Sequence, residues 1–179
     1  LLICGNINLE VGRILPERQY FREIAKADVD LVLITGNITK EGQAANYRSA
    51  LRELSVFPSE YQLVPGDSDS SNNWRQFFGP SYQSFNHEDL FVILLDTGQG
   101  GLTASDAHQW TWLKRQLQQN TQPRILIITN RNPLRGFGDP LEGSLFHELL
   151  VQHQLATGQE IWVITGAQRG FWAEKRSGI

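Results

Sequence analysis

Short apolar runs alternate along the chain with longer segments in which apolar residues recur every three or four positions. Each short run is bounded by Gly, Pro, Asn or Asp, which is the pattern of a buried β-strand. Seven strands are predicted in this way: Leu1–Cys4, Leu31–Ile34, Tyr61–Val64, Phe91–Leu95, Ile125–Thr129, Ile161–Thr165 and Phe171–Ala173. Alternation of such strands with helices is typical of a layered α/β domain.

The segments between these strands have the spacing of amphipathic helices. The predicted helices are Glu17–Ala27, Gln43–Leu54, a segment that contains Trp110, Leu113 and Leu117, and a segment that Asp139-Pro140 opens. Thr103 or Ser105 is expected to cap the third helix, because a hydroxyl oxygen accepts a hydrogen bond from first-turn amides. Leu145, Leu149 and Leu150 are expected on the apolar side of the fourth helix.

Five loops that are rich in Gly, Asn and Asp follow these predicted strands directly. They read Gly5-Asn6-Ile7-Asn8, Gly36-Asn37, Gly66-Asp67-Ser68-Asp69, Asn130-Arg131-Asn132-Pro133 and Gly166-Ala167-Gln168-Arg169. Ligands of α/β folds gather at the loops that follow the carboxyl ends of strands, so these loops are the candidate functional site. A purely structural interpretation stays open for some of them: the glycines fit tight turns, and Asp67, Asp69 and Ser70 fit a turn and a helix cap.

Composition and charge exclude several classes of protein. With 179 residues the chain can bury a sizeable core, and we expect a single domain over residues 1–179. A net charge of −3 does not indicate nucleic-acid binding, and the apolar runs are too short to cross a bilayer. The chain contains no Met and begins on a strand, so we expect a soluble piece of a longer protein, with no indication of its compartment. The single cysteine, Cys4, is expected to be buried.

The ordered set of loops and strands resembles the calcineurin-like metallophosphoesterases, in which the five loops read D-x-H, G-D, G-N-H-D, H-x-P and G-H-x-H. The resemblance extends to the flanking segments and covers essentially the whole chain. Its supporting segments are Leu31–Thr39, Tyr61–Gly66, Phe78–Phe85, Phe91–Thr97, Trp110–Leu117 and Trp162–Gly166. It implies a four-layer α/β/β/α sandwich in which two mixed β-sheets lie face to face with helices outside.

The resemblance implies two metal ions that hold a phosphate and activate a hydroxide, yet most of the ligand positions are replaced. The corresponding positions hold Asn6, Asn8, Asn37, Ser68, Arg131, Ala167 and Arg169. Asn37 replaces the carboxylate that bridges the two ions, and Ser68 replaces the catalytic histidine. Asp67, which replaces an Asn, is the only carboxylate gained. If the register of the fourth loop moves by one, Asn130 rather than Arg131 replaces the histidine.

The charges at these positions disfavour a divalent cation. An amide oxygen is neutral and bridges two dications poorly, and the guanidinium groups of Arg131 and Arg169 stay protonated and cannot act as ligands. Two unit charges of like sign about 4 Å apart repel by ~4 kcal/mol at an effective dielectric near 20, and a dication beside one Arg experiences roughly twice that. We therefore predict a degenerate member of the family with no catalytic residue, no metal and no cofactor.

Two binding roles are compatible with such a site. In the first, Arg131 and Arg169 grip an anion, such as a small phosphate-containing ligand, in the place where metal ions once held phosphate. In the second, Arg169 pairs with Asp67 and fills the site, and the domain acts as a scaffold for a protein partner. Neither role involves nucleic acid or a membrane span.

The enzymatic alternative is a metal-dependent phosphoesterase that keeps one divalent ion, Mn²⁺, Mg²⁺ or Ca²⁺. Its ligands are Asp67, Asn6 and Asn37, with or without Asp69. The histidines add no ligand near the loops, because one is expected in the Asn86–Asp89 turn and the others on or near helices. They are His87, His108, His147 and His153. A different nucleotide-binding α/β fold lacks support, since the chain has no glycine-rich phosphate-binding motif.

Overall fold

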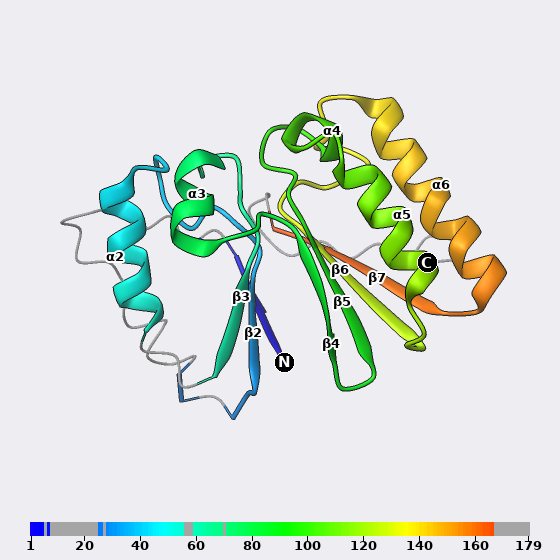
Figure 1. Ribbon diagram of the computed structural model, residues 1–179, viewed down its shortest axis with the longest axis horizontal. Coiled ribbons are helices and arrows are strands. Elements are labelled where there is room, and N and C mark those ends of the chain that lie inside the picture. The colour runs from blue at the N-terminus through cyan, green and yellow to red at the C-terminus, as the bar shows by residue number, and fades with distance from the viewer. Residues whose placement is uncertain (6, 8–24, 27, 56–58, 70, 167–179) are drawn as a thin grey trace.

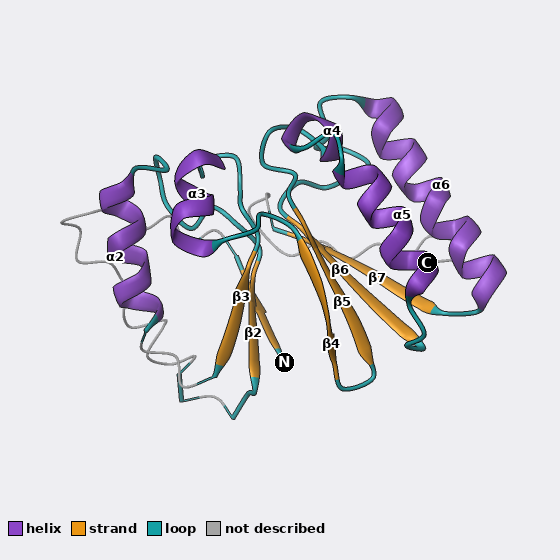
Figure 2. Cartoon of the chain, viewed as in Figure 1, coloured by secondary structure: helices purple, strands orange, loops and turns teal. Residues whose placement is uncertain are grey.

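Two β-sheets lie face to face between two layers of helices, as Figures 1 and 2 show. This computed structural model describes residues 1–5, 7, 25–26, 28–55, 59–69 and 71–166. The predicted α/β/β/α sandwich is confirmed. The predicted strand Phe171–Ala173 and nearly all of the predicted helix Glu17–Ala27 lie outside the described residues.

The first sheet has three described strands in the order β1-β2-β3, and all three run parallel. Its strands are β1 Leu2–Cys4, β2 Leu31–Ile34 and β3 Glu60–Leu63. All four residues of β2 are buried, as expected for a central parallel strand that is covered on both faces. The expectation that both sheets are mixed therefore does not hold for the described part of this one.

The outer face of the first sheet is covered by α2 Ala44–Leu54 and α3 Ser71–Phe78. Tyr47 of α2 and Trp74 of α3 are both almost completely buried. They pack with Val32 and Ile34 of β2 in one apolar cluster. Helix α3 is not among the predicted helices, because it is only eight residues long and begins with three polar residues.

The second sheet is mixed, in the order β4-β5-β6-β7, with β4 antiparallel to β5 and the remaining pairs parallel. Its strands are β4 Gln83–His87, β5 Leu90–Leu95, β6 Arg124–Thr129 and β7 Glu160–Thr165. Its outer face is covered by α4 Leu102–Ser105, α5 Gln109–Gln119 and α6 Pro140–Thr157. None of the helices in the described part of the chain is long and apolar enough to cross a membrane.

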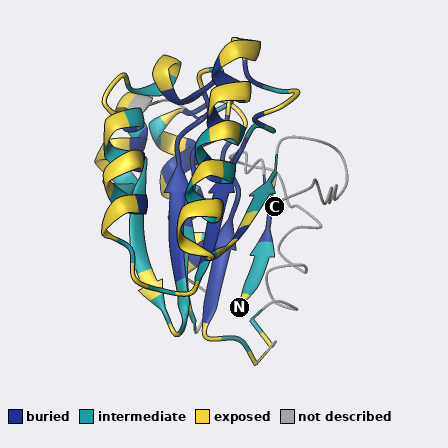
Figure 3. Cartoon of the chain, turned by 90° about the vertical axis from the view of Figure 1, so that its right-hand side faces the viewer, coloured by how far each residue is buried: buried dark blue, intermediate teal, exposed yellow. Residues whose placement is uncertain are grey.

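The space between the two sheets is filled by apolar side chains from both. These are Leu31, Leu33, Val64, Val92, Leu94, Leu126 and Ile128. Because side chains alternate across a strand, the neighbours of Leu31 and Leu33 in β2 point the other way and pack against α2 and α3. In Figure 3 the central strands are accordingly buried, while the exposed residues line the outer surfaces of the helices.

Several element predictions are wrong in detail. Strand β4 was missed, and His87 ends this strand rather than lying in a turn, because β4 is only half-buried and lacks a continuous apolar run. Thr103 and Ser105 do not cap α5; they lie in the separate short helix α4, and α5 follows His108 without a side-chain cap.

The predictions for α6 are partly correct. Asp139 is its N-cap, as expected, and its carboxylate accepts a hydrogen bond from the amide of Leu141 at 2.9 Å. Leu145, which was predicted on the apolar side, is 48% exposed instead. The buried side of this helix is formed by Phe146 and Leu150, together with Glu142.

Candidate functional site

The loops that follow β2, β3 and β6 meet at one edge of the sandwich, which is the upper edge in Figure 1. The Asn130 side chain joins the two sheets there, because its Nδ2 donates to the Thr35 carbonyl at 2.9 Å. The chain also approaches itself closely at this edge: a Cβ on Gly98, after β5, would lie 2.6 Å from the Gly66 carbonyl oxygen. The topology thus brings together loops from both sheets, as the sequence predicts.

Asp69 is the most extensively bonded side chain at this edge. One of its carboxylate oxygens accepts from the amides of Ile38 and Gly66, at 3.0 and 2.9 Å. The other accepts from the amide and hydroxyl of Thr39, both at 3.0 Å, and from the Tyr47 hydroxyl at 3.3 Å. The carboxylate is 3% exposed, and its burial raises its pKa despite these bonds. All five donors come from protein groups, so Asp69 fixes the loops and is not free to join a metal site.

Asn37 and Ser68 lie next to each other, and their polar groups also bind to the protein itself. Asn37 has a left-handed backbone with φ of 49°, a conformation that Asn tolerates better than most residues. Its Oδ1 accepts a hydrogen bond from the Ser68 amide at 3.3 Å. The Ser68 hydroxyl donates to the Thr39 carbonyl. Each side chain therefore supports the loop geometry by bonding to the backbone of a neighbouring loop.

Arg131 brings a cationic side chain to this edge. One terminal nitrogen of its guanidinium lies 3.4 Å from an Asp67 carboxylate oxygen, and the other donates to the Gly136 carbonyl at 3.3 Å. The Arg131 amide donates to the Thr97 hydroxyl at 2.9 Å, which fixes the start of the loop. The Arg131 and Asp67 side chains are 30% and 46% exposed, so their ion pair is accessible to solvent.

Asn130 is completely buried beside Arg131, and its Oδ1 has no hydrogen-bond partner among the residues that the structure describes. Its Nδ2 is held at the junction of the sheets, where a Cβ on Gly36 would lie 2.7 Å away. The two candidates for the histidine position of the fourth loop therefore have different surroundings. Arg131 reaches Asp67 at the surface, whereas Asn130 lies inside the junction between the sheets.

Asp96 is a buried carboxylate at this edge that was not predicted as a candidate site residue. It follows β5, and one of its oxygens accepts from the Gly98 amide at 3.1 Å. Hydroxyls of Ser81 and Ser105 also bond to it, and burial raises its pKa. The sequence does indicate a possible site residue here, because Asp96 directly follows a fully apolar strand. Its spacing alone, however, does not distinguish a site residue from an ordinary turn residue.

The side chains described at this edge do not fit a two-metal centre. Asp67 is paired with a guanidinium, and Asp69 is saturated by five donors. Asp96 is buried and bonded to the Gly98 amide, and the other polar side chains named above, apart from Arg131, are neutral amides and hydroxyls. Within the described ranges, no three His, Cys, Asp or Glu side chains lie close enough to hold a metal ion together. Asn6, Asn8, Ser70, Ala167 and Arg169 lie outside those ranges, and the predicted pairing of Arg169 with Asp67 falls there too.

Two solved phosphatase structures have a fold similar to that of this chain. A purple acid phosphatase from yellow lupin seeds superposes with a TM-score of 0.70 at 12% identity, over 92% of this chain and 37% of that one. A dimetal phosphatase from Danio rerio superposes with a TM-score of 0.67 at 14% identity, over 98% and 83% of the two chains. The chain has the calcineurin-like metallophosphoesterase fold. No family model matches it.

Among curated proteins, this metallophosphoesterase-fold chain is similar to a probable glycerophosphodiester phosphodiesterase of Arcobacter nitrofigilis. The two are 24% identical over 124 residues, an alignment that covers 62% of this chain and 44% of the relative. The chain thus spans less than half the length of this curated relative.

Proposed function

We propose that this chain is a catalytically inactive metallophosphoesterase-like domain with a binding or scaffolding role. The observation that carries the proposal is the ion pair between Arg131 and Asp67 at the edge where the metal-binding loops of the family lie. A guanidinium supplies no lone pair to a metal ion, and it occupies the one solvent-accessible carboxylate among the described loop residues.

The charge at this position supports the same conclusion. A dication about 4 Å from Arg131 would be repelled by roughly 8 kcal/mol at an effective dielectric near 20. Asp67 offsets this repulsion with a single negative charge. Asn37 offers only a neutral amide oxygen, which already accepts a hydrogen bond from the Ser68 amide. The described loops therefore supply too little negative charge to hold two divalent ions.

Of the two binding roles, the contacts of Arg131 favour the scaffold. Both terminal nitrogens of its guanidinium already have acceptors within the protein, in Asp67 and Gly136. A free phosphate would have to displace Asp67 to bind there. Because the ion pair is accessible to solvent, breaking it would cost no more than about 1 kcal/mol. Inorganic phosphate at high concentration can therefore test whether Arg131 binds an anion in place of Asp67.

The test is a hydrolysis assay with bis(4-nitrophenyl) phosphate in the presence and absence of MnCl₂, paired with thermal unfolding in inorganic phosphate. The proposal predicts no Mn²⁺-dependent release of 4-nitrophenolate. A higher melting temperature in phosphate that Arg131→Gln abolishes would identify anion binding as the role. Mn²⁺-dependent turnover that Asn37→Ala or Arg131→Ala alters would contradict the proposal, whereas turnover that neither variant changes would come from a contaminant.

A further inference from the structure

A second candidate site lies on the side of the sandwich where β3 and β4 are the edge strands of the described sheets. A hollow of about 280 Å³ opens there, away from the five loops, and is lined by residues of α2, β3, α3 and β4. Most of the residues that line it are apolar or aromatic, among them Leu51, Tyr61, Phe77 and Phe78, although polar atoms make up the larger part of its exposed wall. Side chains of the two sheets meet in it, since Gln83 Nε2 donates to Gln62 Oε1 at 2.7 Å.

The aromatic lining of this hollow is held in place by packing. Phe77 stacks on the buried Tyr47 ring, with 5.5 Å between ring centroids. Phe78 packs against Trp74 at 4.9 Å, and Trp74 is only 1% exposed. Because the rings that line the hollow rest on buried neighbours, a ligand would enter a preformed site and need not order it first.

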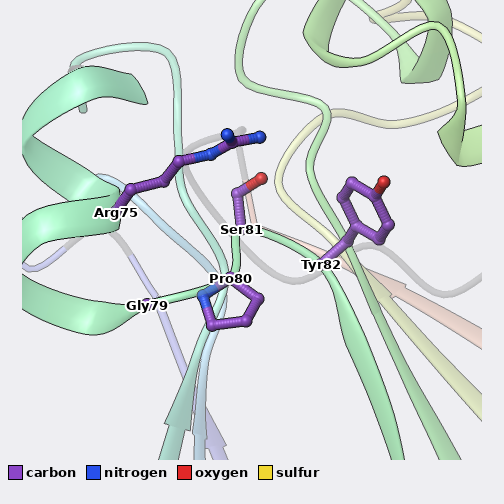
Figure 4. A pocket seen from close by; sticks show the side chains of 5 residues that line it. All are labelled: Arg75, Gly79, Pro80, Ser81 and Tyr82. Carbon is purple, nitrogen blue, oxygen red and sulfur yellow. The ribbon is translucent and has the colours of Figure 1, made fainter.

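A second hollow of about 400 Å³ adjoins the first, and Pro80 lines both. It is shown in Figure 4, where the Arg75 side chain extends from α3 above Ser81, and the Tyr82 ring stands on the opposite side. The Arg75 side chain is 71% exposed, and its carboxylate partner is Asp106 at 3.8 Å. An extended ligand can therefore pass from the apolar hollow across Pro80 to a solvent-accessible guanidinium.

Two more arginines flank the apolar hollow. The Arg48 guanidinium lies 5.8 Å from the centroid of the Phe77 ring, and Arg52 follows one turn later on the same face of α2. Both side chains are exposed, and neither has a carboxylate partner among the described residues. The chain carries a net charge of −3, so this grouping of cations around one hollow runs against its overall charge. Acidic side chains are also present: Glu53 follows Arg52 on α2, and the carboxylate of Glu60 accepts from Gln62 at 2.9 Å.

We propose that these two hollows form a docking site for an acidic segment of a partner protein that inserts one aromatic or large aliphatic side chain. The occupant follows from the shape and the charge of the site. The first hollow, of about 280 Å³, has room for one anchor side chain, and the adjoining hollow and its arginine extend the site along a chain that carries acidic residues. The anchor fills the aromatic hollow, and acidic residues beside it face Arg48, Arg52 and Arg75.

This proposal goes beyond the inactive-domain proposal, because it names the chemistry of the partner at a place remote from the five loops. The two can fail separately. Hydrolysis or metal binding at the loops would leave the docking site untouched, and loss of the docking site would say nothing about metal at the loops.

The test uses a fluorescein-labelled peptide, Asp-Glu-Asp-Trp-Glu-Asp, titrated with the protein while fluorescence anisotropy is measured at low salt. Saturable binding is expected to weaken at least about tenfold when the peptide Trp is replaced by Ala, since tenfold corresponds to about 1.4 kcal/mol. A similar loss is expected in the protein variant that combines Arg48→Glu with Arg75→Glu. The matched control is Arg115→Glu, an exposed arginine on α5 in the other helical layer, which should bind the peptide normally.

Three results would overturn the docking proposal. The first is the absence of saturable binding to a protein whose circular dichroism shows the native fold. The second is equal binding of the Trp and Ala peptides, or of polyglutamate, which would reveal only a polyanion-binding surface. The third is an equal loss of binding in the Arg115→Glu control, which would reveal a general charge effect.

Discussion

Replacing Asp69 by Ala should strongly destabilise the fold. The substitution would leave the buried amides of Gly66, Ile38 and Thr39 without the acceptor that they share. An unsatisfied buried donor costs about 1–3 kcal/mol, so three cost about 3–9 kcal/mol before relaxation. Water that enters the vacated space offsets part of this, and we expect a loss of about 3–5 kcal/mol.

Urea unfolding monitored by circular dichroism measures this loss. With an m-value of about 2 kcal/mol per molar urea, the midpoint should fall by about 2 M. Asp67→Ala is the matched control, because Asp67 lies two residues away and makes only a solvent-accessible ion pair with Arg131 at 3.4 Å. That variant should lose less than about 1 kcal/mol. Equal losses in the two variants, or a loss below about 1 kcal/mol for Asp69→Ala, would refute the assigned role of the Asp69 carboxylate.

Three further predictions follow from buried groups. Gly66→Ala should destabilise the fold by several kcal/mol more than Gly79→Ala in urea unfolding. The new Cβ at position 66 would lie 2.3 Å from the Asn37 amide nitrogen, whereas a Cβ on Gly79 meets no atom within 4 Å and adds only the strain of its φ of 81°. Burial raises the pKa of Cys4 to about 11, which lowers the fraction of reactive thiolate. At constant pH, iodoacetamide should therefore alkylate the native thiol about a hundredfold more slowly than the urea-unfolded thiol. Similar rates would contradict the burial of Cys4. Burial also raises the pKa of Asp96, so the folded chain takes up this proton at higher pH than the unfolded chain. The free energy of unfolding should therefore increase as pH falls from the raised pKa of Asp96 towards the ordinary pKa of an aspartate. In a plot of this free energy against pH, Asp96→Asn should remove the part of the slope that Asp96 contributes.

The elements that the sequence predicts best are those buried on both faces. Strands β2, β5 and β6 are continuous apolar runs because sheet or helix covers both of their sides, and their predicted bounds agree with the structure to within one residue. Strand β4 escapes this pattern because most of its residues are only half-buried. Leu145 shows the opposite error: an apolar residue at helical spacing was placed in the core although it faces solvent.

The convergence of the loops could also be predicted, because parallel strands deliver their carboxyl ends to one edge. The bonding of individual polar side chains could not. Asp69 binds amides about thirty residues away in the chain, and Asn130 binds a carbonyl 95 residues away. Spacing in the sequence contains no information about such partners. The same reason explains why Arg131 was not foreseen as a partner of Asp67.

The central claim is that the five loops no longer hold divalent metal, and Mn²⁺ electron paramagnetic resonance tests it most directly. Mn²⁺ is added to the metal-free protein in one and then two equivalents, and the six-line signal of hydrated Mn²⁺ is compared with that of buffer alone. The account predicts full signal intensity at both additions, since Arg131 repels the ion and the neighbouring amides supply no charge. Loss of most of the signal at one equivalent, or at both additions, would contradict it.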